Sequence, residues 1–261
     1  AKKLVEKLIN NSKELNVLVK KGPLNCTIID AGIEIKGIDT HIGSQINQLE
    51  PFSHSFDILK EIISMLKDKG FKIDVIDVGG GLGVKYKNNE TSIDVKEYGK
   101  LLSEKLGKLD CKVIIEPGRF LTANAGVLVT KILHIKKSDI KNFVIVDAGM
   151  NDFIRPTLYG AHHNIIPLKE PGKLGNLKCD IVGPVCETGD FFAKDVDLKD
   201  VDEDDFLAIC STGAYGSVQS SNYNTRASID ELLINNGEYE IIRQRINEET
   251  IIDRDIISKW V

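Results

Sequence analysis

The sequence predicts two parts of different fold class: a parallel α/β unit over residues 1–125, and a mainly antiparallel β domain with a terminal helix over residues 126–261. Strand and helix patterns alternate along the first part, which is typical of parallel strands covered by helices, as in a barrel or a doubly wound sheet. Along the second part, short strands follow one another with turn residues between them, and helical patterns are few.

Each element of the α/β unit follows from the spacing of its apolar residues. Phe52, Phe56 and Leu59 fall on one side of a helix. Three strands are legible, too few to close an eight-stranded barrel. In chain order we expect a helix over 1–19, a strand over 33–42, a helix over 51–69, a strand over 71–78, a helix over 95–106 and a short buried strand over 112–115.

The β domain is predicted from short β-branched and aromatic runs bounded by turn residues. A loop is expected over 170–177, which contains a Pro-Gly pair and two further turn residues. The expected strands cover residues 126–135, 143–148, 178–182, 206–211, 231–234 and 239–243.

Composition excludes several classes of protein. The formal net charge is −5 and no long basic block occurs, which argues against nucleic acid as a main partner. The five cysteines are widely spaced without a C-x-x-C pair, which favours a reducing, cytoplasmic setting over a disulfide framework. No apolar run approaches the length of a membrane span. Because the chain lacks an initiator Met, we expect it to begin inside a longer protein.

Three expected strands end at small or polar residues, and these ends are candidates for an anion site. Glycines there let backbone N–H groups approach a phosphate, and Ser44 and Arg119 add a hydroxyl and a guanidinium. Each segment alone also fits a structural role: a tight turn for the glycines, or a structural histidine for His41. The segments are His41–Gln45, Gly79–Gly83 and Glu116–Arg119.

The β domain holds a second set of candidate residues. Arg155 and Tyr159 stand four residues apart, Cys186 precedes Glu187, and Tyr215 lies between glycines. Their alternatives are a small buried apolar residue for Cys186, and surface ion pairs or turn residues for the others. The adjacent histidines at 162 and 163 do not face one ion in regular structure, and no other ligand spacing occurs, so we expect no metal.

Taken together, these segments resemble the diaminopimelate decarboxylase family of pyridoxal-phosphate (PLP) enzymes, which have an alanine-racemase-like barrel. The RPxLYG and PVCETGD forms are specific to that family, whereas ornithine and arginine decarboxylases share the other pieces. The resemblance runs from about Ile35 to the C-terminus through HIGSQI (41–46), DVGGGLG (77–83), EPGRFLTANAG (116–126), VDAGMNDFIRPTLYG (146–160), DIVGPVCETGDFFAKD (180–195) and GAYGSVQSSNYNTR (213–226).

The resemblance implies a fold, a cofactor and a reaction. The fold is the C-terminal part of a PLP-binding (β/α)8 TIM-type barrel followed by a β domain, in a homodimer with the site between subunits. The reaction is decarboxylation of meso-2,6-diaminopimelate to L-lysine and CO₂.

The resemblance also implies a role for each matched residue. His41 stacks on the PLP ring, Glu116 pairs with its nitrogen, and Cys186, supplied by the partner subunit, reprotonates the α-carbon. Glu187 meets the distal ammonium group. Ser44, Gly81, Gly118 and Arg119 hold the phosphate region; Arg119, Arg155 and Tyr159 bind substrate carboxylates; and Tyr215 contacts both cofactor and substrate.

One expected feature of the family is absent from the sequence. The lysine that anchors PLP lies in a Y-A-V-K-A-N-like segment on an early barrel strand, and no lysine before His41 stands in such a segment. Two alternatives therefore stay open. One is a non-catalytic homologue that acts as a binding or regulatory subunit. The other is a related decarboxylase of ornithine, arginine or carboxynorspermidine.

Overall fold

The computed structural model describes residues 36–68, 70–87, 89–170 and 175–260. The helix predicted over 1–19 and the start of the strand predicted over 33–42 lie outside these residues. The chain forms two compact units, which are described separately: unit 1 contains the described residues of 1–85 and 91–120, and unit 2 those of 86–90 and 121–261.

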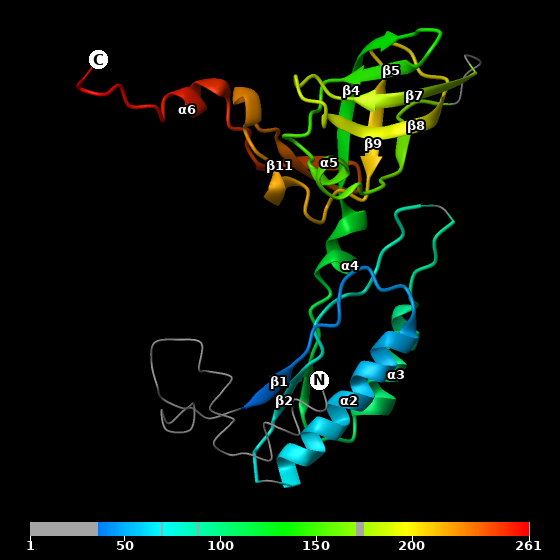
Figure 1. The fold of residues 1–261 in the computed structure, drawn as a ribbon, viewed down its shortest axis with the longest axis vertical. Helices are drawn as coiled ribbons and strands as arrows, with labels where there is room; N and C mark the ends of the chain where they lie inside the picture. The colour runs from blue at the N-terminus through cyan, green and yellow to red at the C-terminus, as the bar shows by residue number, and fades with distance from the viewer. Residues whose placement is uncertain (1–35, 69, 88, 171–174, 261) are drawn as a thin grey trace. The chain divides into compact units, whose positions relative to one another are not determined.

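Unit 1 is built on a three-stranded parallel sheet, in the order β1 (Gly37–Asp39), β2 (Val75–Asp77), β3 (Lys112–Ile114). Helix α2 (Leu49–Asp68) precedes β2, and α3 (Val95–Leu106) precedes β3 (Figure 1). The apolar side of α2 packs with Tyr98 of α3 and with Ile76 of β2 in one buried cluster. A short helix, α4 (Gly118–Thr122), follows β3.

Unit 2 is built on a six-stranded sheet in the order β6-β9-β4-β5-β7-β8. Neighbouring strands are antiparallel except β5 and β7, which are parallel, and the edge strands β6 and β8 also contact each other, so the sheet nearly closes into a mixed barrel. The strands are β4 (Val127–Lys136), β5 (Asn142–Val146), β6 (Ile165–Pro167), β7 (Asn176–Val182), β8 (Phe191–Lys199) and β9 (Phe206–Cys210).

The barrel core is a cluster of buried branched and aromatic side chains from the strands, among them Ile132, Val144, Ile181 and Leu207. The alternating burial of β4 follows from its period of two, which turns successive side chains to opposite faces. The short helix α5 (Arg155–Tyr159) follows β5 and contacts β8. The arrangement of β4, β5, β7, β8 and β9 around the core can be followed in Figure 1.

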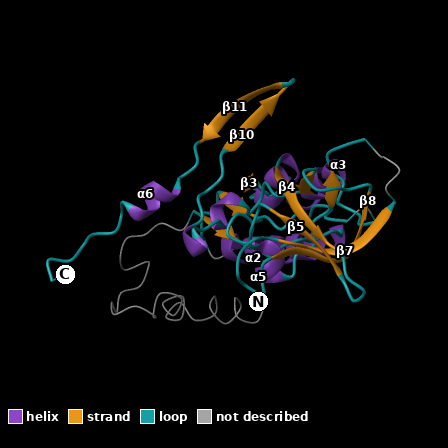
Figure 2. Ribbon diagram, turned by 90° about the horizontal axis from the view of Figure 1, so that it is seen from above, coloured by secondary structure: helices purple, strands orange, loops and turns teal. Residues whose placement is uncertain are grey.

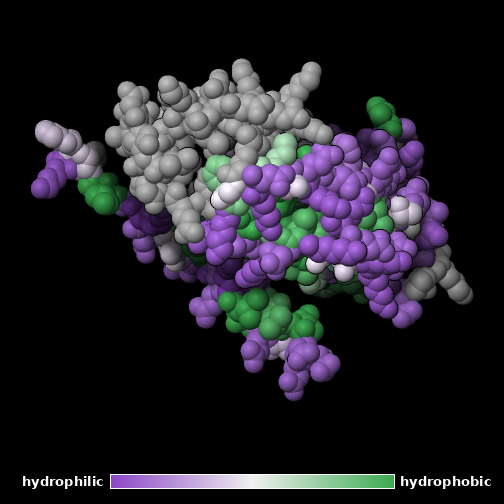
Figure 3. Space-filling view, turned by 90° about the horizontal axis from the view of Figure 1, so that it is seen from below, coloured by the Kyte–Doolittle hydropathy of each residue, from purple (hydrophilic) through white to green (hydrophobic). Residues whose placement is uncertain are grey.

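A separate hairpin, β10 (Glu231–Asn235) and β11 (Glu238–Arg243), and a helix, α6 (Glu248–Ile252), end the chain (Figure 2). The hairpin exposes apolar side chains, including Leu233, Ile234 and Tyr239. Apolar patches also stand out against the polar surface in Figure 3. Within the described residues, no helix combines the length and the apolar character needed to cross a membrane.

Most elements predicted from the sequence are confirmed, with three differences. The helix over 95–106 has the predicted bounds, and the strands of unit 1 are parallel. The predicted loop over 170–177 is wrong at its end, because β7 already begins at Asn176. Strands β6 and β8 and helices α4 and α5 have no counterpart among the predicted elements. One strand pair of the β domain is parallel, which makes its sheet mixed.

Candidate functional site

In unit 1, the loops after the three parallel strands meet at one edge of the sheet, because parallel strands end on the same side. The Glu116 N–H donates to the Gly79 carbonyl at 2.9 Å, and the Gly80 N–H donates to His41 Nδ1 at 3.3 Å. Arg119 Nη2 donates to the Ser44 hydroxyl at 3.1 Å. The candidate residues predicted on separate strands are therefore neighbours within unit 1.

The glycines after β2 allow this close approach of the loops. A Cβ on Gly80 would stand 2.2 Å from the Glu116 carbonyl oxygen, and one on Gly81 would stand 2.6 Å from the Gly43 oxygen. Gly81 also has a φ of +96°, which side chains disfavour. A Cβ on Gly118 would meet nothing within 4 Å, so the space beside that residue is open. The Gly118 N–H itself donates to the Glu116 carbonyl.

Three carboxylates gather beside these loops. The side-chain oxygens of Asp39, Asp77 and Glu116 lie within 4.8 Å of one another. Asp39 and Asp77 are register partners on β1 and β2, so their closeness follows from the sheet. One oxygen of Asp77 accepts the Gly79 N–H at 2.9 Å. The group concentrates negative charge around Glu116, which suits a cationic ligand atom. Sequence reasoning missed this group because the strand register is not visible in the sequence.

In unit 2, Arg155 is a buried cation among tyrosine rings. Arg155 is the first residue of α5, and it is 7% exposed. The guanidinium carbon lies 5.6 Å from the ring centres of Tyr159 and Tyr215, and 5.9 Å from that of Tyr86. Among the described residues, no carboxylate forms an ion pair with Arg155, and its Nε has no hydrogen-bond partner. The ring faces attract the cation, but a buried charge favours an anionic partner.

Tyr86 was not among the predicted site residues. It belongs to the 86–90 segment, where Glu90 accepts the N–H groups of Tyr86 and Lys87 at 2.9 and 3.2 Å. The hydrogen bond from Tyr86 is the main cause that lowers the pKa of Glu90. The Tyr86 ring also stands edge-on to buried His163, with 5.0 Å between ring centres. No local motif marks this tyrosine, since its partners lie far away in the sequence.

Cys186 and Glu187 lie on a tight turn between β7 and β8. Both are exposed, which excludes the alternative of a buried apolar role for Cys186. The Glu187 N–H donates to the Val185 carbonyl at 2.8 Å, and the Thr157 hydroxyl of α5 donates to the Gly189 carbonyl. Among the described residues, Glu187 is the one charged side chain that lines a cavity of about 500 Å³, together with Met150, Asn151, Ile154, Ser221, Asn222 and Tyr223.

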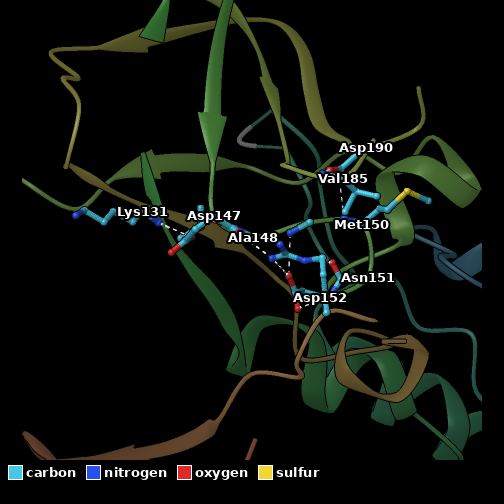
Figure 4. Close-up of polar contacts among 11 residues, drawn as sticks. Lys131, Asp147, Ala148, Met150, Asn151, Asp152, Val185 and Asp190 are labelled. Carbon is cyan, nitrogen blue, oxygen red and sulfur yellow. Dashed lines mark hydrogen bonds and ion pairs between the residues drawn. The ribbon is translucent and has the colours of Figure 1, made fainter. Parts of the chain in front are cut away.

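A buried polar network supports this turn (Figure 4). Asp190 accepts the backbone N–H groups of Met150 and Val185, and Asp152 accepts the Gly149 N–H at 2.8 Å. Arg226 donates to the Asn151 side chain at 2.8 Å and lies 3.8 Å from an Asp152 oxygen. Burial raises the pKa of both aspartates, against the hydrogen bonds that lower it. The PVCETGD segment contains Asp190, but its role was not predicted.

The predicted site residues thus form three groups. His41, Ser44, Gly81, Glu116, Gly118 and Arg119 belong to the strand ends of unit 1. Arg155, Tyr159 and Tyr215 form one cluster in unit 2. Cys186 and Glu187 form a turn in the same unit, joined to α5 through Thr157.

Comparison with known sequences gives consistent matches. Residues 26–213 match the sequence family described as pyridoxal-dependent decarboxylase, C-terminal sheet domain. The chain is 43% identical over 221 residues to the diaminopimelate decarboxylase of Aquifex aeolicus, covering 85% of this chain and 52% of that protein. It is 48% identical over 214 residues to that of Vibrio cholerae, covering 82% and 51%. The chain spans about half the length of these relatives.

Solved structures agree with the sequence matches. Diaminopimelate decarboxylase from Helicobacter pylori, complexed with L-lysine, has a TM-score of 0.81 at 38% identity, with 94% of this chain and 58% of that chain covered. The enzyme from M. jannaschii, in co-complex with L-lysine, has a TM-score of 0.83 at 31% identity, with 95% and 56% covered.

Proposed function

The chain belongs to the pyridoxal-dependent decarboxylase family and is a homologue of diaminopimelate decarboxylases, and we propose that it forms the C-terminal part of an enzyme that converts meso-2,6-diaminopimelate to L-lysine and CO₂. In this proposal, residues 1–125 complete a PLP-binding (β/α)8 barrel and residues 126–261 are its β domain. The observation that carries the proposal is Arg155, a buried cation with three tyrosine rings and no described carboxylate partner.

The donor set of unit 1 fits PLP. The phosphate of PLP needs hydroxyl and guanidinium donors beside small residues, and Ser44 and Arg119 meet at 3.1 Å next to the glycine loop. We assign phosphate contacts to Ser44, Gly81, Gly118 and Arg119. The carboxylates around Glu116 suit a protonated ring nitrogen, so Glu116 would pair with that nitrogen and keep the proton on the ring. When bound, the cofactor supplies an electron sink for the charge left by CO₂.

The residues around the reacting carbon have separate tasks. His41 follows β1 and would stack on the cofactor ring, where it would limit access of water. Cys186 carries a thiol at an exposed turn and delivers its proton to the α-carbon after CO₂ leaves. In a homodimer this thiol comes from the partner subunit. A thiol is suited to this because it can donate a proton near neutral pH.

The charges of unit 2 suit a substrate that is charged at both ends. Arg155 with Tyr159 binds a substrate carboxylate, and Tyr215 contacts the substrate. Arg119, which belongs to unit 1, is also assigned to a substrate carboxylate. Glu187 binds the distal ammonium group. A buried guanidinium without an anionic partner selects strongly among substrates. A substrate that lacks the matching carboxylate leaves the guanidinium unpaired. Ornithine has no distal carboxylate, so it leaves such a group unpaired.

The test is turnover by the longest natural form of the protein that contains this sequence, loaded with PLP. We expect CO₂ and L-lysine from meso-diaminopimelate, with ornithine and arginine turned over at least about tenfold less efficiently. Preference for ornithine or arginine would overturn the substrate assignment. Absence of both turnover and substrate binding would overturn the enzyme assignment.

A second candidate is a subunit that binds PLP without a covalent link. Borohydride reduction followed by peptide mass mapping separates the two. A pyridoxyl group on a lysine supports the enzyme, whereas bound cofactor that is lost on denaturation after reduction supports the non-catalytic subunit.

A further inference from the structure

We propose that Asp190 is the positioning residue that fixes the Cys186–Glu187 turn against the loop that follows β5, beside the cavity that both loops line. What the turn accomplishes chemically rests on the proposed function. How it is held does not, because the argument uses contacts within unit 2 alone.

Both oxygens of the Asp190 carboxylate accept hydrogen bonds from backbone N–H groups. One accepts the Met150 N–H at 2.7 Å, and the other accepts the Val185 N–H at 2.6 Å. Val185 directly precedes Cys186, and Met150 lines the same cavity as Glu187. A single side chain, 4% exposed, therefore ties the turn to the loop that follows β5 (Figure 4).

The backbone of Asp190 closes the turn as well. Its N–H donates to the Glu187 carbonyl at 3.0 Å, and its carbonyl accepts the Gly183 N–H at 3.0 Å. The backbone of Asp190 thus joins the two ends of the 183–190 segment. Cys186 lies at an exposed position inside this closed segment, where its direction depends on the hydrogen bonds at the base.

Gly183 shows that the segment is shaped around the carboxylate. A Cβ at Gly183 would stand 2.4 and 2.5 Å from the two Asp190 oxygens, closer than real Cβ contacts. The loop that follows β5 is anchored too, because Asp152 accepts the Gly149 N–H and Arg226 donates to the Asn151 side chain. Asp190 therefore links the turn to a fixed support.

The energetics favour a role in position over one in stability. Burial raises the pKa of Asp190 although the N–H groups of Val185 and Met150 lower it, so keeping this charge buried costs free energy. Proteins keep buried charges that cost free energy chiefly at functional sites. An asparagine cannot replace the carboxylate, because its NH₂ would face one of the two N–H donors.

The first test measures hydrogen exchange in the Asp190→Asn variant of the 261-residue chain. We expect the amides of peptides covering 147–152 and 183–190 to exchange about tenfold faster, since one charge-assisted hydrogen bond is lost. Peptides from β4 and β9 should exchange at unchanged rates, which separates local release from unfolding. Asp197→Asn makes the same charge change at an exposed site on β8 and should alter neither region. Unchanged exchange at 183–190 would overturn the proposal.

The second test follows Cys186 itself. Its alkylation rate with iodoacetamide, mapped by peptide mass from pH 6 to 9, should rise severalfold in Asp190→Asn and much less in Asp190→Glu, which retains an anionic acceptor. The buried Cys179 reports on global opening and should react equally slowly in the unsubstituted chain and in both Asp190 variants. An equal rise in Asp197→Asn would mean that charge alone is responsible and would contradict positioning. If the protein has no decarboxylase activity, the proposed function fails while these two readouts still decide the inference.

Discussion

Arg155 can be tested by a substitution that retains its charge. Lysine keeps the positive charge but loses the planar fork that binds a carboxylate with two hydrogen bonds. If Arg155 binds a substrate carboxylate, Arg155→Lys should weaken binding of meso-diaminopimelate about tenfold or more, because hydrogen bonds to charged groups are worth roughly 1.5–3 kcal/mol. Calorimetric titration measures this loss. Arg243→Lys changes an exposed arginine of the hairpin and serves as the control.

A second substitution at the residue scale tests Gly80. Alanine there would place its Cβ 2.2 Å from the Glu116 carbonyl oxygen, so the loop must move. We expect Gly80→Ala to lower the free energy of unfolding of unit 1 by about 1–3 kcal/mol, measured by urea denaturation. Gly99→Ala is the matched control, since its Cβ meets nothing within 4 Å and α3 should gain stability. Equal effects would refute a steric requirement at Gly80.

Single residues were predictable from the sequence where a local motif carries the chemistry. Ser44 and Arg119 were selected from separate strand ends and do form a hydrogen bond. Tyr86, Asp39 and Asp77 were not selected, because their partners are set by strand register and by a loop that folds onto unit 2. Contacts of this kind carry no periodic signal in the sequence.

At the scale of elements, Tyr98 on α3 makes the stability of the packing between α2 and α3 depend on pH. Burial raises the pKa of Tyr98 from 10.0 to about 12. Between these pH values the unfolded chain loses the proton while the folded unit keeps it, so stability is complete below pH 10 and falls as the pH rises towards 12. The loss amounts to roughly 2–3 kcal/mol. Tyr98→Phe should remove this part of the alkaline unfolding transition, followed by circular dichroism. An unchanged transition would contradict the assignment.

Long amphipathic elements were predicted well, and short or irregular ones were missed. Helix α2 places Phe52, Phe56, Leu59 and Ile63 in its buried side, a spacing that indicates a helix directly. Strand β8 was missed because its middle is charged and only its ends are buried. Helix α5 has five residues, too few to show a period. Its helical conformation depends on its surroundings in unit 2, since helices this short are not stable alone.

At the scale of the whole molecule, the terminal hairpin predicts self-association. A two-stranded hairpin is marginal in water, and Leu233 and Ile242 are both more than half exposed. Replacing both with Lys should shift the chain towards monomer in sedimentation velocity experiments, because apolar surface is removed from the contact. The urea transition of the two units should stay the same. Association that persists unchanged would show that another surface is responsible.

The order of α/β and β parts could be read from the sequence, but the membership of residues 86–90 could not. The first part was expected to be one continuous segment, whereas these five residues group with unit 2 and their flanks with unit 1. The signal is absent because the segment is polar and has no element of its own. Such grouping depends on tertiary contacts, which a single sequence does not reveal.

This crossing of the chain has a consequence for folding and for proteolysis. The peptide links at 85–86, 90–91 and 120–121 all join the two units, so no single cut separates them. A polypeptide beginning at Leu121 would lack Tyr86 and would leave one side of Arg155 open to water. Maturation of the arginine cluster must therefore wait until both units have been synthesised and the 86–90 segment has docked. A nick within that segment should loosen the contact between Tyr86 and Arg155 while both units keep their secondary structure.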